Sequence, residues 1–318
     1  MSIMKTLGNI GIVPVSVIED ATNAVPTARA MADGGIPAIE ITLRTAAGLD
    51  AIEAVAKNCS DICVGAGTVL NLDDEKRCLD KGAKFIVSPG FDRKMADWSI
   101  KNNIPYLPGC VTPTEIMAAL EMGINIVKFF PANVYGGLSA MKALAAPFTG
   151  VKFMPTGGVS GQNVAEFLSA SYIHAVGGSW VCAKADVNAG QFEKIRTLSE
   201  EAVRASLGFE VAHVGINNEN AEIASSVCTQ LQNMFGFSIK EGNSSSFASG
   251  TIEVMKSNYL GEKGHLAIRT TNMTRAIYYL SKKGYSVDES TYKYKNGAVT
   301  AAYLKDEVGG FAIHLLQK

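Results

Sequence analysis

A lysine lies in the middle of a short apolar run at residues 126–132 (IVKFFPA), and its side chain could do chemistry. Lysine is rarely placed in such a run for packing alone, because a buried ammonium group is costly unless it is paired or neutralised. Desolvation favours the neutral amine, which is a nucleophile towards carbonyl carbon, as in Schiff-base enzymes. The alternative is a strand-end lysine whose head group reaches solvent. The run alone leaves both interpretations of Lys128 open.

Eight short apolar runs alternate with alanine-rich amphipathic stretches along the first two thirds of the chain. Such alternation implies parallel strands joined by right-handed crossovers, and eight units in about 200 residues is the lower size limit of a (β/α)8 TIM barrel. A doubly wound open sheet is the alternative, but the glycine-rich turn that often follows its first strand is missing from GIVPVSVIED. We therefore expect an α/β barrel. The runs lie at residues 11–18, 36–44, 62–70, 84–90, 104–111, 126–131, 151–159 and 174–180.

Polar residues and glycines gather at the C-terminal ends of these runs, where such a barrel carries its active site. Each of these residues also has a purely structural interpretation. A glycine at a strand end often serves only a turn, and an acid near a guanidinium can form a structural ion pair. It is the combination of an acid, a guanidinium, a lysine and two glycine-rich ends on one rim that indicates function. The rim residues are Glu40, Arg44, Thr68, Pro89, Lys128, Thr156, Gly157, Gly158, Gly178 and Ser179.

The chemistry of these residue types indicates a substrate. The glycine-rich ends at 157–158 and 178–179 close the last two strands, where such barrels commonly bind phosphate through backbone N–H groups and a helix N-terminus. Arg44 can hold a carboxylate in a bidentate fork, and Glu40 lies in apolar surroundings that suit a proton shuttle. A phosphate, a carboxylate and an amine nucleophile between them indicate a phosphorylated 2-keto acid whose carbon–carbon bond is cleaved through an imine.

Six motifs, in order and within about residues 5–206, resemble the class I 2-keto-3-deoxy-6-phosphogluconate (KDPG) and 4-hydroxy-2-oxoglutarate (KHG) aldolase family. They are IEITLRT, GAGTVL, VSPG, VKFFPA, PTGGV and GGSW. The resemblance implies a trimeric barrel that needs no metal or other cofactor and cleaves KDPG to pyruvate and glyceraldehyde 3-phosphate, with 4-hydroxy-2-oxoglutarate as a further substrate. The alternatives are an aldolase for 2-keto-3-deoxy-6-phosphogalactonate and a non-catalytic phosphosugar-binding barrel.

The resemblance also implies a role for each rim residue. Lys128 forms the imine and Glu40 is the general acid/base. Asn133 departs from the acidic residue that many relatives carry after the Pro-Ala pair, which concerns fine specificity rather than the imine. The substrate-binding residues are Arg44 and Thr68 for the carboxylate, Pro89 and Phe130 for the pocket wall, and Gly157, Gly158 and Ser179 for the phosphate, with Thr156 and Gly178 beside them.

The pattern changes near Gly208, after an amphipathic helix at residues 190–208. A strand, a helix and three strands are expected at residues 211–216, 219–235, 237–241, 245–249 and 251–256. The same order recurs at 264–270, 273–283, 285–289, 298–305 and 311–317. This duplication predicts a smaller α+β domain of two βαβββ repeats, which should pair because a single repeat would leave exposed edges. The expected domains are therefore 1–207, the barrel, and 208–318.

Four polar residues on the strands of this second domain could bind a metal. His213 and Glu253 belong to the first repeat, and His265 and His314 belong to the second. Three imidazoles and a carboxylate suit a divalent cation such as Zn, Mn, Ni, Co or Fe. The alternative is a set of pocket-lining or hydrogen-bonded histidines without metal. The segments HVGI, IEVM, GHLAIRT and DEVGGFAIHLLQ resemble the vicinal oxygen chelate superfamily, whose members usually have a glutamate where this chain has His314.

Composition limits the partners. The net charge of −1 gives no basic field for nucleic acid, and no apolar run approaches the ~20 residues of a membrane helix. The six cysteines have neither disulfide nor zinc-finger spacing, which is typical of reduced thiols in a cytoplasmic protein. We therefore expect a cytoplasmic homotrimer that binds a phosphorylated 2-keto acid and pyruvate, with neither nucleic acid nor membrane as a partner.

Overall fold

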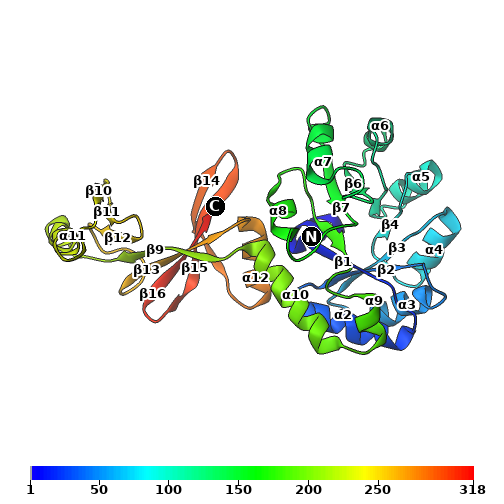
Figure 1. Cartoon of the computed structure of the whole chain (residues 1–318), viewed down its shortest axis with the longest axis horizontal. Helices are drawn as coiled ribbons and strands as arrows, with labels where there is room; N and C mark the ends of the chain where they lie inside the picture. The colour runs from blue at the N-terminus through cyan, green and yellow to red at the C-terminus, as the bar shows by residue number, and fades with distance from the viewer. Residues whose placement is uncertain (1) are drawn as a thin grey trace. The chain divides into compact units, whose positions relative to one another are not determined.

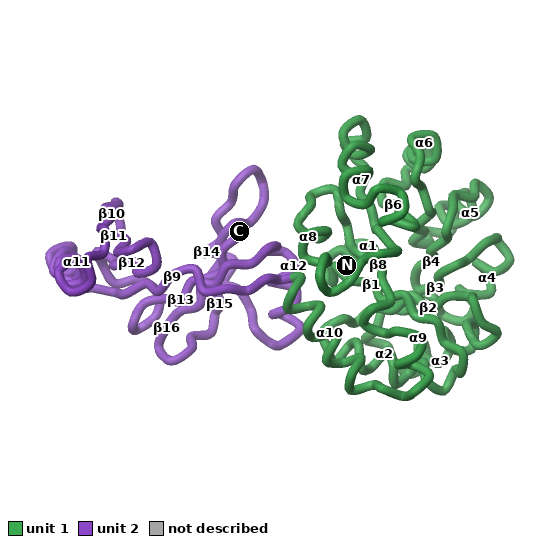
Figure 2. Tube along the Cα trace, in the orientation of Figure 1, with its two compact units in different colours: residues 1–206 green, residues 207–318 purple. Residues whose placement is uncertain are grey.

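The computed structural model describes residues 2–318 and divides the chain into two compact units (Figure 2). The first unit comprises residues 1–206 and the second comprises residues 207–318. The division falls one residue before the boundary expected from the sequence. Each unit has its own sheet and its own buried core.

A curled parallel sheet forms the centre of the first unit (Figure 1). Six strands pair in the order β5-β4-β3-β2-β1-β8, and β6 pairs with β7 in a separate ladder. Single bridges join Gly109 to Lys128 and Thr156 to Gly177. The expected parallel α/β architecture is confirmed. The strands are β1 (Ile12–Ser16), β2 (Ala38–Thr42), β3 (Cys63–Gly67), β4 (Ile86–Val87), β5 (Tyr106–Leu107), β6 (Ile126–Phe129), β7 (Lys152–Pro155) and β8 (Val176–Gly178).

The helices of the first unit follow the strands as the amphipathic stretches predict. Strands β1, β2 and β3 are buried along their whole length, which explains why their runs are almost continuously apolar. A capping box of Thr112 and Glu115 begins α6. The helices are α1 (Ile3–Ile10), η1 (Ala21–Asn23), α2 (Ala24–Asp33), α3 (Gly48–Asn58), α4 (Leu72–Asp80), α5 (Arg93–Lys101), α6 (Pro113–Glu121), α7 (Gly137–Ala145), α8 (Val164–Ser169), α9 (Lys184–Asn188) and α10 (Phe192–Leu207).

One eight-stranded sheet forms the second unit, in the order β10-β11-β12-β9-β13-β16-β15-β14. The chain order of the elements is βαβββ twice, and an asparagine side chain, Asn220 or Asn272, caps the helix of each repeat. The two repeats meet where β9 pairs with β13. The elements are β9 (Glu210–Ile216), α11 (Ala221–Phe235), β10 (Ile239–Glu241), β11 (Ser245–Ala248), β12 (Ile252–Met255), β13 (Gly264–Thr270), α12 (Met273–Lys282), β14 (Val287–Lys295), β15 (Ala298–Val308) and β16 (Phe311–Gln317).

The hairpin of β14 and β15 is longer than expected from the sequence. We expected the first strand to end at residue 289, but β14 continues to Lys295. Asn296 and Gly297 both have positive φ, 51° and 77°, as a two-residue hairpin turn requires. The Asn-Gly pair was therefore the missed signal. No helix within residues 2–318 is long and apolar enough to cross a membrane.

Candidate active site

The structure brings Lys128 and Glu40 together inside the first unit. The Nζ atom of Lys128, on β6, lies 3.3 Å from Oε1 of Glu40, on β2. Only 4% of the lysine side chain and none of the glutamate side chain is exposed. The other carboxylate oxygen of Glu40 is buried and has no hydrogen-bond partner among residues 2–318. A buried amine therefore lies beside a carboxylate with spare capacity to exchange a proton.

Gly67 makes room for the Glu40 carboxylate. It ends β3, and its neighbour on β2 is Thr42. A Cβ atom at position 67 would overlap Oε1, Cγ and Cδ of Glu40. Any larger residue would push the carboxylate away from its place beside Lys128. Gly67 was not among the predicted site residues, although the GAG pattern at 65–67 is a signal for close approach.

Arg44 and Thr68 meet at the C-terminal ends of β2 and β3. The Nε atom of Arg44 donates a hydrogen bond of 3.1 Å to Oγ1 of Thr68. Thr68 has a φ of 56°, which a β-branched residue rarely adopts. Strained backbone of this kind gathers at functional sites, where the surrounding structure holds it. The pair lies at the end of the sheet expected to bind the carboxylate, and the exposed guanidinium keeps N–H groups available for an anion.

Phe130 and Pro89 lie on the same rim. The ring centre of Phe130 is 5.4 Å from Nζ of Lys128, so the ring forms one wall beside the amine. Pro89 follows β4 and contacts the segment around Gly109, whose missing side chain lets the two backbones approach. Gly109 itself bridges to Lys128. The structure thus places Pro89 one backbone segment away from the lysine.

The residues expected to bind phosphate form the part of the rim after β7 and β8. Thr156 bridges to Gly177, which precedes Gly178 and Ser179. Gly157 and Gly158 have φ angles of 92° and 87°, a conformation that favours glycine. Among residues 2–318, the N–H group of Gly158 donates no hydrogen bond, and Oγ1 of Thr156 is buried without a partner. These donors suit an anion.

Comparison with known proteins gives the same assignment. Residues 3–198 match the family model described as KDPG and KHG aldolase. The chain belongs to this family. It is 40% identical over 204 residues to a 2-dehydro-3-deoxy-phosphogluconate aldolase of Treponema pallidum, an alignment that covers 64% of this chain and 97% of that protein. It is 39% identical over 195 residues to the KHG/KDPG aldolase of Escherichia coli K12, covering 61% of this chain and 92% of that protein.

Solved structures of family members resemble this KDPG/KHG-family chain. The KDPG aldolase of Legionella pneumophila, with pyruvate captured as a covalent carbinolamine intermediate, superimposes with a TM-score of 0.61 at 34% identity. That match covers 63% of this chain and 97% of the other. The Zymomonas mobilis enzyme with 3-phosphoglycerate has a TM-score of 0.58 at 37% identity, covering 63% of this chain and 94% of the other.

The four candidate metal ligands of the second unit lie on four neighbouring strands. Glu253 is on β12, His213 on β9, His265 on β13 and His314 on β16. Strand register explains why they share one face. Glu253 and His265 both pair with Gly215, and His213 and His314 both pair with Ala267. Residues directly opposite each other in a sheet point to the same side.

Three of these side chains converge on one point. The Nε2 atoms of His213 and His265 are 3.0 Å apart, and Oε2 of Glu253 lies 3.0 Å and 3.1 Å from them. A Cβ atom at Gly215 would overlap the His265 ring, so this glycine is required. The ligand atoms of the three histidines, including His314, lie within 4.8 Å of one another.

Hydrogen bonding alone does not satisfy this triangle of atoms. An ionised carboxylate carries no proton and each Nε2 carries at most one in the neutral ring or the imidazolium, so at most two of the three contacts can have a proton. A cation satisfies all three, and two ligands bound at right angles at about 2.1 Å lie about 3.0 Å apart. The donor set therefore fits a divalent metal, and a histidine-rich set favours a transition metal over Mg or Ca.

The charges in the cluster agree with this fit. Burial opposes ionisation of Glu253, but hydrogen bonds from His213, His265 and Ser245 hold the pKa of its carboxyl well below the ordinary value. Burial, followed by the neighbouring His265 and His213, lowers the pKa of His314 to about 4. His314 is therefore neutral at pH 7, as a metal ligand must be. Its ring stacks on Tyr303 with centroids 4.4 Å apart.

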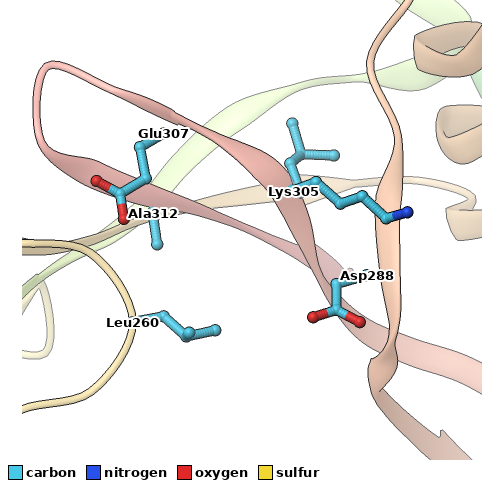
Figure 3. Close-up of a pocket in the computed structure, with 6 residues that line it drawn as sticks. Leu260, Asp288, Lys305, Glu307 and Ala312 are labelled. Carbon is cyan, nitrogen blue, oxygen red and sulfur yellow. The ribbon is translucent and has the colours of Figure 1, made fainter.

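The second unit also holds a cavity of about 280 Å³, whose lining residues Figure 3 draws. Strand register places lining residues of this cavity on the same face of the sheet as the cluster, because Tyr303 pairs with both His314 and Asp288, and Ala312 pairs with both His265 and Glu307. This cavity was not predicted from the sequence, because its walls come from separate strands and a loop. The cavity is lined by Leu260, Asp288, Leu304, Lys305, Glu307 and Ala312.

Proposed function

We propose that the first unit is a class I aldolase that cleaves KDPG to pyruvate and glyceraldehyde 3-phosphate through an imine on Lys128. The observation that carries this proposal is the buried pair of Lys128 and Glu40, with Nζ and Oε1 3.3 Å apart. Family membership makes the chain an aldolase, and relatives named 2-dehydro-3-deoxy-phosphogluconate aldolase support the substrate. The paired lysine and glutamate argue against a non-catalytic phosphosugar-binding barrel.

The mechanism uses the amine as nucleophile and the carboxylate as proton carrier. Lys128 gives a proton to Glu40 and attacks the C2 carbonyl of the substrate as the free amine, and Glu40 returns that proton when the carbinolamine loses water to give the iminium. Glu40 then takes the proton of the C4 hydroxyl. The C3–C4 bond breaks, its electron pair moves to the iminium to form an enamine, and glyceraldehyde 3-phosphate leaves. Protonation of the enamine and hydrolysis release pyruvate and the free lysine.

The remaining rim residues hold the two ends of the substrate in this proposal. Arg44 and Thr68 bind the carboxylate next to the imine, with Phe130 and Pro89 as the wall of the pocket. The phosphate at the other end accepts hydrogen bonds from backbone N–H groups, which attract anions without a side-chain charge. Because the iminium itself accepts the electrons of the broken bond, the reaction needs no cofactor. The phosphate-binding residues are Thr156, Gly157, Gly158, Gly178 and Ser179.

Three further properties belong to this proposal. The eight strands close into one (β/α)8 barrel, supported by the bridges that join Gly109 to Lys128 and Thr156 to Gly177. The enzyme is a homotrimer, and the exposed apolar side chains of Leu70, Met117 and Val134 offer surface for association. A cytoplasmic location agrees with six cysteines that form no disulfide among residues 2–318.

Pyruvate release tests the proposed activity. The full-length protein is assayed with KDPG, with 2-keto-3-deoxy-6-phosphogalactonate and with 4-hydroxy-2-oxoglutarate, each beside a Lys128→Met variant. We expect the highest kcat/KM with KDPG and no release by the variant. A preference for the galactonate epimer would favour the alternative aldolase. Pyruvate release by the Lys128→Met variant would contradict the proposal. Failure of the wild-type protein to release pyruvate from any of the three acids would contradict it as well.

We also propose that the second unit, a domain of vicinal oxygen chelate type, binds a divalent transition metal. The triangle of His213, His265 and Glu253 carries this second proposal, with His314 as the fourth candidate ligand. A bound metal would act there as a Lewis acid for an oxygen-bearing ligand. The cavity of about 280 Å³ on the same face of the sheet offers room for the rest of that ligand.

A further inference from the structure

Asn133 is bound to the glycine pair at the phosphate end of the first unit. Its backbone N–H donates a hydrogen bond of 3.1 Å to the carbonyl of Gly157, and its Nδ2 donates one of 3.2 Å to the carbonyl of Gly158. Directly before it, the N–H of Ala132 donates to the carbonyl of Thr156 at 2.8 Å. Three successive carbonyls after β7 are therefore bound by two successive residues after β6.

A second asparagine supports the same carbonyl. The Nδ2 atom of Asn163 donates to the Gly158 carbonyl at 2.9 Å. The Oδ1 atom of Asn163 accepts the backbone N–H of Ser160 at 2.8 Å, which holds the side chain in place. The Gly158 carbonyl thus receives two amide donors from different segments. The peptide unit that follows Gly158 cannot rotate without breaking both hydrogen bonds.

The orientation of the carbonyls determines the orientation of the N–H groups. In a planar trans peptide, the carbonyl of one residue and the N–H of the next point in opposite directions. Binding the carbonyls of residues 156, 157 and 158 therefore turns the N–H groups of residues 157, 158 and 159 away from Asn133. Among residues 2–318, the N–H groups of residues 158 and 159 donate no hydrogen bond. They are left available for an anion.

We propose that Asn133 is a positioning residue that, in this chain, holds these N–H groups ready for phosphate and so strengthens the preference for phosphorylated substrates. This inference rests on the proposed aldolase function and names the residue behind its substrate class. The amide matters because it donates to a carbonyl. An ionised aspartate of the same size donates no hydrogen bond, faces the Gly158 carbonyl with a negative oxygen and adds a negative charge next to the phosphate.

The test compares two substrates and one simple anion across matched variants. Asn133→Asp and Asn133→Ala are measured with KDPG and with its unphosphorylated counterpart, and inorganic phosphate is used as a competitive inhibitor. Asn102→Asp is the control. The Nδ2 atom of Asn102 also donates to a backbone carbonyl, that of Trp98 at 2.8 Å, but at the end of α5, away from the rim. It therefore undergoes the same chemical change without touching the glycine pair.

We expect Asn133→Asp to raise the KM for KDPG and the inhibition constant of phosphate by roughly tenfold, and Asn133→Ala to raise both by about threefold to fivefold. The kcat/KM for the unphosphorylated acid should change less than twofold, and Asn102→Asp should match the wild type on every measure. Equal losses with both substrates would overturn the inference, because Asn133 would then support the fold generally. An unchanged preference in Asn133→Asp would overturn it as well.

The failure of the inference and the failure of the proposed function give different results. A wild-type protein that releases pyruvate equally well with and without the phosphate would remove phosphate recognition from the proposed function, and the inference with it. If the wild type prefers the phosphorylated acid and the Asn133 variants keep the same preference, only the role of Asn133 is overturned. The proposed aldolase function would stand.

Discussion

The Nζ atom of Lys128 lies 3.3 Å from Oε1 of Glu40, although the two residues are 88 positions apart in the chain. One belongs to β6 and the other to β2, strands that are not neighbours in either ladder of the first unit. The pair forms because the curled sheet turns both strands towards a common interior, where apolar side chains exclude water. A nucleophile and a proton carrier for imine chemistry are thus supplied by two separate parts of the sheet.

We expect Lys128 to be the residue that bonds covalently to substrate. Treatment with pyruvate and borohydride should reduce the imine and attach one pyruvate-derived group to Lys128, identified by peptide mass spectrometry. The Lys128→Met variant should show no adduct and no pyruvate release, because it keeps the length of the side chain without the amine. Modification of another lysine in active wild-type protein would contradict the imine on Lys128.

Substitution of Gly67 by alanine should impair catalysis indirectly, through Glu40, and not through a contact with the substrate. The new Cβ would displace the Glu40 carboxylate, so kcat should fall at least tenfold, approaching the roughly 10²–10⁴-fold loss expected for Glu40→Gln. Gly150→Ala is the matched control, since a Cβ there meets nothing within 4 Å. Steady-state kinetics and thermal unfolding are compared for all three variants. Full activity in Gly67→Ala would mean that the place of Glu40 beside Lys128 is unimportant.

Metal analysis should find about one divalent transition-metal ion per chain after purification without chelator. His213→Ala, His265→Ala and Glu253→Gln should each lose the ion, because each removes one corner of the triangle. His174→Ala is the control, since it is the one histidine of the four outside the cluster. Removal of the metal should lower the unfolding temperature of the second unit and leave pyruvate release intact. If the purified protein contains no metal and added metal leaves its unfolding temperature unchanged, the metal site is wrong. Hydrogen bonds alone would then hold the three side chains together.

Glu75 should reduce stability at neutral pH. Burial raises the pKa of its carboxyl above the ordinary value, and the hydrogen bond from Ser99 opposes that rise only in part. An acid with a raised pKa in the folded state binds its proton more tightly when folded, so its contribution to stability is lost as pH rises above the unfolded pKa. Glu75→Gln keeps an acceptor for Ser99 and removes the charge.

Calorimetry checks this expectation at two pH values. At pH 7, Glu75→Gln should raise the unfolding temperature by roughly 2–4 °C, the shift that about 1 kcal/mol produces in a domain of this size. At pH 4 most of the gain should vanish, because this pH lies below both the ordinary pKa of the carboxyl and its raised pKa in the folded state. Glu201→Gln, at an exposed position of α10, should show no such difference. An equal gain at both pH values would rule out ionisation as the cause.

The sequence by itself determined the elements and the chemistry of the rim. Apolar runs and amphipathic stretches are local patterns, and local hydrogen bonding and burial determine whether they become strands or helices. Parallel strands end at one edge of their sheet, so Lys128, Glu40, Arg44 and the glycine pair at 157–158 could be grouped without coordinates. The duplicated βαβββ pattern likewise grouped the three histidines and Glu253 by repeat, but it could not show that they meet.

Only the tertiary structure decided how closely these groups approach one another. Sheet curl and strand register determine the distance between Lys128 and Glu40 and the space that Gly67 leaves. They also determine the three contacts among His213, His265 and Glu253. The same is true of the hydrogen bonds from Asn133 to the glycine pair. These quantities arise between segments that are distant in the chain, and an error of one residue in register would turn a side chain to the opposite face. No local pattern of residue types carries that information.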